Sequence, residues 1–166
     1  MDPNQMTMLL AILLLLAFSA YFSASETAFT SLNRVRLRTR AEGGDRRAAQ
    51  ALDLAQDYDR LLTTILIGNN VVNIAATTLS TALFIDLLGS ANGPAVSTLV
   101  LTVAVLIFGE VSPKSLAKER SESFAMLSAP VMSLLVRLLS PLSALFALLK
   151  RGLSRLFHTA DEQGIT

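Results

Sequence analysis

Residues 61–88 decide the fold, and they read LLTTILIGNNVVNIAATTLSTALFIDLL. As one α-helix these 28 residues would extend roughly 42 Å, which exceeds the ~30 Å hydrocarbon core of a bilayer. The whole chain shares this apolar character, because 52% of its 166 residues are hydrophobic and only 16% are charged. That composition is too apolar for one small globular core, so we expect a bilayer to be its solvent.

Two further apolar stretches flank this one and predict two more spans, over residues 6–32 and 95–113. A cleaved signal peptide is the alternative for the first, but such peptides begin with basic residues, whereas residues 1–7 carry only Asp2. Glycine, asparagine and proline over 89–94 predict a short turn between the second and third spans. The fold class is therefore an all-α integral membrane protein with three transmembrane helices.

The arginines and lysines set the expected orientation. Residues 33–60 carry the first arginines of the chain, whereas the segments 1–7 and 89–94 contain neither lysine nor arginine. Because positively charged loops stay on the cytoplasmic side, we expect the amino terminus and the 89–94 turn outside and the carboxyl terminus in the cytosol of an inner (plasma) membrane protein.

Within the stretch 122–156, residues 124–149 are apolar enough to suggest a fourth span, but a span here would carry Lys150, Arg151 and Arg155 outside. Pro130 and Pro141 also interrupt the stretch. We therefore expect juxtamembrane amphipathic helices along the inner interface. The transmembrane domain is predicted to cover residues 1–157, and the polar residues 158–166 read as a linker.

Several functional classes are disfavoured by what the sequence contains. There is no cysteine and a single histidine, so a metal would have to be bound mainly by oxygen. A net charge of +1, without interleaved aromatic and basic residues, does not favour a nucleic-acid partner. We find no phosphate-binding loop, dinucleotide fingerprint, zinc-protease or serine-hydrolase motif, and we do not expect an enzyme.

Two acidic residues fall well inside the expected spans, Glu26 and Glu110, where an ionisable group usually faces a partner, a cavity or an ion path. Glu26 lies near the cytosolic end and could instead pair with an arginine. Glu110 could instead pair with Lys114 one helical turn later. Pro113 cannot donate to the Gly109 carbonyl four residues earlier, so a free carbonyl is expected beside the Glu110 carboxylate.

Small polar residues lie at the same depth in the other two spans. Asn70, Asn73 and Thr77 share one helical face, and Ser25 lies at a similar distance from the outer end of its span. Hydrogen bonds between helices are the alternative explanation for the asparagines, and packing is the alternative for each serine. Together these oxygens suit a hard cation such as Mg²⁺ or Na⁺ rather than zinc or copper.

Three motifs carry a resemblance to a known family. They read FSASETAF over residues 22–29, LIGNNVVN over 66–73 and GEVSPK over 109–114. In this order and spacing they resemble the membrane domain of the CorC and cyclin-M family of magnesium transporters, over roughly residues 5–155.

The resemblance implies a homodimer that sits in membrane lipid, binds dehydrated Mg²⁺ and exports it in exchange for Na⁺. Matching positions imply ligands to the transported Mg²⁺ at Ser23, Ser25, Asn70, Gly109 and Glu110, with Asn73 as a further candidate. ATP would bind only to cytosolic domains outside this chain. The competing interpretation is a dimeric membrane anchor that senses an ion and regulates cytosolic domains without transport.

Overall fold

The computed structural model describes residues 1–162, and every regular element among them is helical. The helices are α1 (Pro3–Ser31), α2 (Arg34–Glu42), α3 (Arg46–Gln56), α4 (Tyr58–Ala104), the π-helical segment η1 (Val105–Val111), α5 (Ser112–Glu119), α6 (Ser121–Leu138) and α7 (Ser140–Glu162). The all-helical class predicted from the sequence is confirmed. The predicted linker over 158–166 begins inside α7, and its residues 163–166 lie outside the described part.

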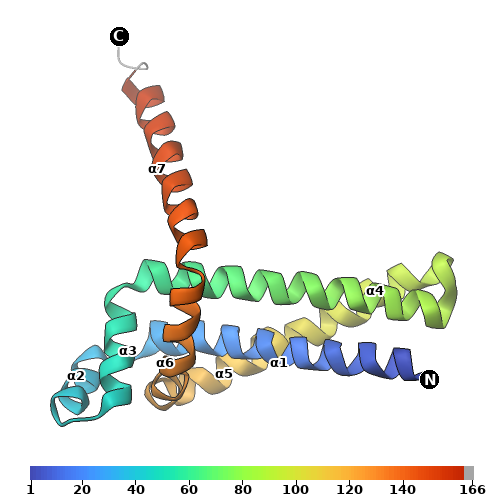
Figure 1. Cartoon of the computed structure of the whole chain (residues 1–166), viewed down its shortest axis with the longest axis horizontal. Helices are drawn as coiled ribbons and strands as arrows, with labels where there is room; N and C mark the ends of the chain where they lie inside the picture. Colours follow the sequence, from blue (N-terminus) through green and yellow to red (C-terminus); the bar gives the residue numbers. More distant parts are fainter. Residues whose placement is uncertain (163–166) are drawn as a thin grey trace.

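Two helical stretches are long and apolar enough to cross a bilayer, Pro3–Ser31 and Tyr58–Glu119. The second has 62 residues and would extend ~93 Å if it were straight, about three hydrocarbon cores. It instead folds back at Gly89, whose φ of 82° and ψ of 167° are almost exclusive to glycine. Figure 1 shows α4 running away from the start of the helix and returning beside itself. The fold-back divides this stretch into two apolar arms, residues 58–88 and 90–119.

The turn between the two arms is tighter than the loop expected over 89–94, because helix resumes directly after Gly89. A Cβ atom on Gly93 would lie 2.7 Å from the Cα of Ile85, so only glycine allows the arms to approach this closely. The hydroxyls of Ser80 and Ser97 are hydrogen-bonded at 2.8 Å and are both buried. The hairpin therefore closes on a polar pair shielded from lipid.

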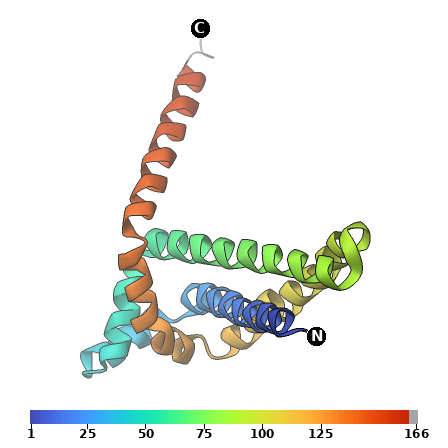
Figure 2. The ribbon, with the colours of Figure 1, turned by 45° about the vertical axis from the view of Figure 1, so that its right-hand side comes forward.

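The helices α6 and α7 form a pair bent by 67°. The break precedes Pro141, whereas Pro130 lies inside a continuous α6 and does not interrupt it. Figures 1 and 2 show that α7 runs across the direction of α1 and α4. Since α1 and α4 set the direction of membrane crossing, this arrangement supports an interfacial α7 rather than a fourth span.

Residues 34–56 form a helical hairpin, α2 and α3, that the sequence pattern did not predict. Asn33 accepts a hydrogen bond from the Arg36 amide, and Asp45 accepts from the amides of Arg47 and Ala48, so both helices begin on a capping side chain. Gly44, with φ of 95°, allows the turn between them. The short, arginine-rich helix α2 has only one buried residue, Leu37, and therefore little apolar periodicity to reveal it.

Two apolar clusters hold the structure together. The bundle cluster joins all of the α-helices from α1 to α6 and includes Phe29, Leu37, Leu61 and Met132. The hairpin cluster lies toward the Gly89 turn and consists of Ile12, Ala76, Leu83 and Leu101 with partly buried neighbours. Between these clusters, a hydrogen bond between Ser19 and Asn69 joins α1 to the first arm of α4.

The chain has no cysteine, so single cysteines can test the expected orientation. We expect Ala91→Cys, beside the Gly89 turn, to react with a membrane-impermeant thiol reagent on intact cells, while Gly43→Cys and Thr159→Cys stay unlabelled. Permeabilised cells provide the control, because all three cysteines should then react. Labelling of Thr159→Cys on intact cells would mean that the α6–α7 pair crosses the membrane.

Candidate functional site

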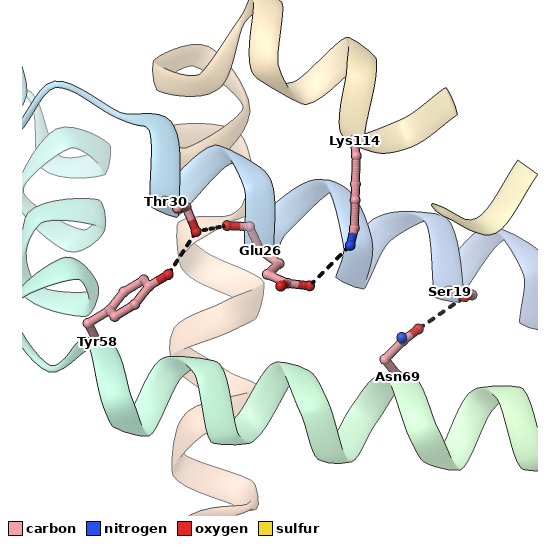
Figure 3. Close-up of polar contacts among 6 residues, drawn as sticks. All are labelled: Ser19, Glu26, Thr30, Tyr58, Asn69 and Lys114. Atoms are coloured by element: carbon pink, nitrogen blue, oxygen red, sulfur yellow. Dashed lines mark hydrogen bonds and ion pairs between the residues drawn. The ribbon is translucent and has the colours of Figure 1, made fainter. Parts of the chain in front are cut away.

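Three arms, namely α1 and the two arms on either side of Gly89, meet at Ser19. This residue belongs to α1 and is fully buried. Its hydroxyl donates a hydrogen bond of 3.0 Å to the Asn69 side-chain oxygen of α4, and Figure 3 shows the two side chains pointing toward each other. From the returning arm, Gly109 lies beside the same hydroxyl, since a Cβ on Gly109 would be 3.1 Å from Ser19 Oγ. Ser19 therefore fixes the level at which the three arms present polar groups.

Asn69 reaches Ser19 because the helices α1 and α4 approach each other closely at Gly68. A Cβ on Gly68 would lie 2.4 Å from the Phe22 ring, so the missing side chain makes room for that ring between α1 and α4. Phe22 is buried and packs edge-on against Tyr21. The motifs FSASETAF and LIGNNVVN thus contact each other through an aromatic ring and a glycine.

Two of the predicted ligands are buried oxygens without a hydrogen-bond partner in the part of the chain that the structure describes. They are the Ser25 hydroxyl and the Asn73 side-chain oxygen. Tyr21 lies close to Ser25, but the contact lacks hydrogen-bond geometry, and the Tyr21 hydroxyl donates instead to the Ser128 carbonyl at 3.3 Å. Because a buried polar group without a partner is costly, these two oxygens have free capacity to bind a cation.

Ser23 is buried in α1, as expected for a group facing the other arms. Asn70, by contrast, is exposed, and its neighbour Asn69 is the asparagine that faces α1. The face of α4 toward α1 therefore carries Asn69 and Asn73 at i, i+4 rather than the expected Asn70, Asn73 and Thr77. That spacing is equally visible in the sequence, and the buried Ala76 and Ser80 continue the same face.

The two acidic residues have different surroundings. Glu26 lies 3.8 Å from the Lys114 ammonium, and both side chains are nearly half exposed (Figure 3). The charge partner expected for Glu26 is therefore present, although it is a lysine rather than an arginine. The Glu110 side chain makes no ion pair or hydrogen bond within residues 1–162, so the alternative pairing with Lys114 is not formed.

Gly109 and Glu110 lie in a π-helical segment, which the sequence analysis did not anticipate. The Ser112 amide donates to the Ile107 carbonyl five residues earlier, instead of to the fourth residue back as in an α-helix. The expectation of a regular α-helix with one carbonyl freed by Pro113 therefore describes the wrong register. Such π-helical turns recur at functional sites, because they re-aim main-chain carbonyls and side chains.

The donor chemistry at this level is almost entirely neutral oxygen. No group of three or more histidine, aspartate or glutamate side chains gathers among the described residues, and the carboxylate adjacent to Gly109 in the chain is that of Glu110. A cation bound here would rely on hydroxyl, amide and main-chain oxygens with one formal negative charge. This set suits a hard cation and does not suit a metal that prefers nitrogen or sulfur.

Several known proteins are similar in sequence to this chain. The family model described as the cyclin M transmembrane N-terminal domain matches residues 9–166. The chain is 44% identical over 138 residues to the UPF0053 inner membrane protein YfjD of Escherichia coli, covering 83% of this chain and 32% of that protein. A UPF0053 protein of Haemophilus influenzae is 37% identical over 150 residues, covering 90% and 36% respectively.

A third relative has a named activity. The polyamine export protein of Haemophilus influenzae is 29% identical over 173 residues, covering 95% of this chain and 40% of that protein. The chain spans about a third of the length of the first two relatives.

Proposed function

Because the chain belongs to the cyclin M transmembrane-domain family, together with the UPF0053 membrane proteins, we propose that it carries a cation through the level at which its three arms meet. We propose further that the cation is Mg²⁺ leaving the cytosol and that Na⁺ entry drives it. The family is one of transporter-like membrane proteins rather than a known enzyme family.

One observation carries the proposal: the buried oxygens of Ser25 and Asn73 lack partners, and the Glu110 carboxylate lacks a counter-ion, in the described residues. A purely structural cluster would satisfy its own groups, as Ser19 and Asn69 do. A cation bound beside any one of these groups would supply its missing partner, and the three groups mark a path along the helices rather than one coordination shell. The proposed ligands come from Ser23, Ser25, Asn69, Asn70, Asn73, the Gly109 carbonyl and Glu110.

The exposed position of Asn70 supports the homodimer that the family resemblance implies. Val71 and Ile74 beside it are both more than 60% exposed, so this face of α4 would otherwise meet lipid. An amide in contact with hydrocarbon is costly. A second subunit against this face would cover Asn70 and could bring it to the ion path, which keeps Asn70 among the proposed ligands.

Ion flux in proteoliposomes tests the proposal most directly. Vesicles loaded with a fluorescent Mg²⁺ indicator and containing the purified protein should take up Mg²⁺ when an opposing Na⁺ gradient is applied, and uptake should stop when that gradient is abolished. Mg²⁺ binding without flux would favour the ion-sensing anchor. Flux that is independent of Na⁺ would retain the Mg²⁺ pathway but contradict the coupling.

The named activity of one relative supplies a second candidate cargo, a polyamine. Ammonium groups donate hydrogen bonds to the same hydroxyl, amide and carboxylate oxygens that would bind Mg²⁺. Putrescine or spermidine added to the flux assay separates the two cargoes. A polyamine cargo predicts that labelled polyamine itself crosses the vesicle membrane and that Mg²⁺ competes with it, whereas an Mg²⁺ cargo predicts Mg²⁺ flux without any movement of labelled polyamine.

A further inference from the structure

A groove separate from the site described above lies between the first turns of α4 and the first half of α7. It encloses about 660 Å³, within the ~300–1,000 Å³ typical of small-molecule sites. Figures 1 and 2 show α7 crossing beside the beginning of α4. The apolar arm of α4 begins at Leu61, so the groove lies where the chain passes from water to bilayer.

Charges of both signs line this groove, and none of them forms an ion pair within residues 1–162. Asp57, Asp59 and Arg60 come from the start of α4, and Lys150 and Arg151 come from α7. Arg60 donates a hydrogen bond to the Ser140 hydroxyl, which leaves its other donors available. Unpaired charges of both signs are an unusual lining for a groove that has only protein and solvent to satisfy it.

Ser143 is a second, independent indication of a ligand. Its side chain lines the groove and is only 9% exposed, yet its hydroxyl oxygen has no hydrogen-bond partner in the described part of the chain. A buried hydroxyl normally has a partner, so one is missing here. Lys150 and Arg151 also line this groove, and they would attract an anionic group toward the same helix.

The membrane-facing part of the groove is apolar. Leu66 and Ile67 of α4 and Phe146 of α7 line it, and Leu66 is 62% exposed. The apolar residues of α7 recur at helical spacing at positions 142, 145, 146, 149, 153, 156 and 157, and every one of them is exposed. A molecule in the groove would therefore meet charge at one end and hydrocarbon-compatible surface at the other.

We propose that this groove binds a phospholipid with an amine headgroup, of the phosphatidylethanolamine class. The phosphate would contact Lys150, Arg151 and the Ser143 hydroxyl. The ammonium would contact Asp59, with Asp57 nearby. The upper part of the acyl chains would follow Leu66, Ile67 and Phe146 into the bilayer.

The pairing of charges selects this headgroup over the other common ones. A headgroup that is only anionic, such as phosphatidylglycerol, would bring negative charge toward Asp57 and Asp59. Phosphatidylcholine has the same two charges, but its quaternary ammonium carries no N–H and cannot donate to a carboxylate. A primary ammonium beside a phosphate matches both halves of the groove.

Native mass spectrometry of the protein in mild detergent, titrated with single lipids, tests this proposal. Phosphatidylethanolamine should bind more tightly than phosphatidylcholine or phosphatidylglycerol. The double variant Lys150→Gln/Arg151→Gln should weaken its binding by about tenfold, since each change removes a charge-assisted contact. Asp59→Asn should reduce the ratio of the affinity for phosphatidylethanolamine to that for phosphatidylcholine. Both lipids should still bind through the phosphate.

The matched control is Arg46→Gln/Arg47→Gln, which makes the same change of charge on α3, away from the groove. It should bind phosphatidylethanolamine as the unaltered protein does. If the Lys150 and Arg151 variant does not fold, Ser143→Ala removes the partnerless hydroxyl with little other change and should still weaken binding several-fold. Equal binding of the three lipids, stronger binding of phosphatidylglycerol, or equal losses in the α3 control would each overturn the proposal.

Discussion

Replacing Glu110 with alanine should weaken Mg²⁺ binding by about 10- to 100-fold, because it removes a charged ligand worth ~1.5–3 kcal/mol. The Glu110 side chain has no ion pair in the described residues, so its charge is available to a bound cation. The Mg²⁺ affinity of Glu110→Gln should lie between those of the unaltered protein and Glu110→Ala, since glutamine keeps an oxygen but loses the charge. Isothermal calorimetry with MgCl₂ on the detergent-solubilised protein measures all three affinities.

Glu26→Gln is the matched control for this experiment. It makes the same chemical change in a nearby arm, but Glu26 is paired with Lys114 and is nearly half exposed. We expect its Mg²⁺ affinity to stay within about twofold, because a screened pair of this kind contributes little. An unchanged affinity in a folded Glu110→Ala variant would remove Glu110 from the site, and a large loss in Glu26→Gln would add Glu26 to it.

Gly93→Ala should have the largest effect on stability. Its Cβ would lie 2.7 Å from the backbone N and Cα of Ile85 and from the Phe84 carbonyl oxygen, and backbone cannot move aside as a side chain can. Overpacking of this kind costs about 3 kcal/mol. The thermal unfolding midpoint in detergent should therefore fall by several degrees, and the Ser80–Ser97 contact across the hairpin should weaken.

Gly152→Ala provides the comparison, because nothing lies within 4 Å of the Cβ it would add to the helix α7. Alanine is the better helix former by about 1 kcal/mol, so this variant should unfold at the same or a higher temperature. A midpoint for Gly93→Ala equal to that of Gly152→Ala would show that the two arms separate more easily than the structure implies.

The strongly apolar parts of the fold could be predicted from the sequence, because hydrophobic length is a direct requirement of the bilayer. The stretch 61–88 agrees with the first arm of α4, and the 89–94 turn was placed correctly, although it narrows to Gly89. The α2–α3 hairpin was missed because its stability comes from tertiary contacts with α6 and from capping side chains. These signals are local and weak compared with apolar runs.

Depth counting predicts Ser25, Asn73 and Glu110 at one level, because helical rise is nearly constant. The structure instead sets Ser19, Asn69 and Gly109 side by side, and Ser25 and Asn73 lie on opposite sides of that level. Which asparagine faces α1 depends on helix rotation, and the contact between Gly68 and Phe22 sets that rotation so that Asn69 points inward. The π-helical register of η1 is invisible in residue types, since Pro113 predicts only a missing donor.

The polar level at Ser19 lies between the bundle cluster and the hairpin cluster, and both are closely packed apolar layers. An ion is poorly soluble in such a layer, because moving a charge into apolar surroundings is costly. If the chain exchanges Mg²⁺ for Na⁺ as we propose, an ion that leaves this level must pass one apolar layer while the other stays closed, because parting both layers at once would open a pore.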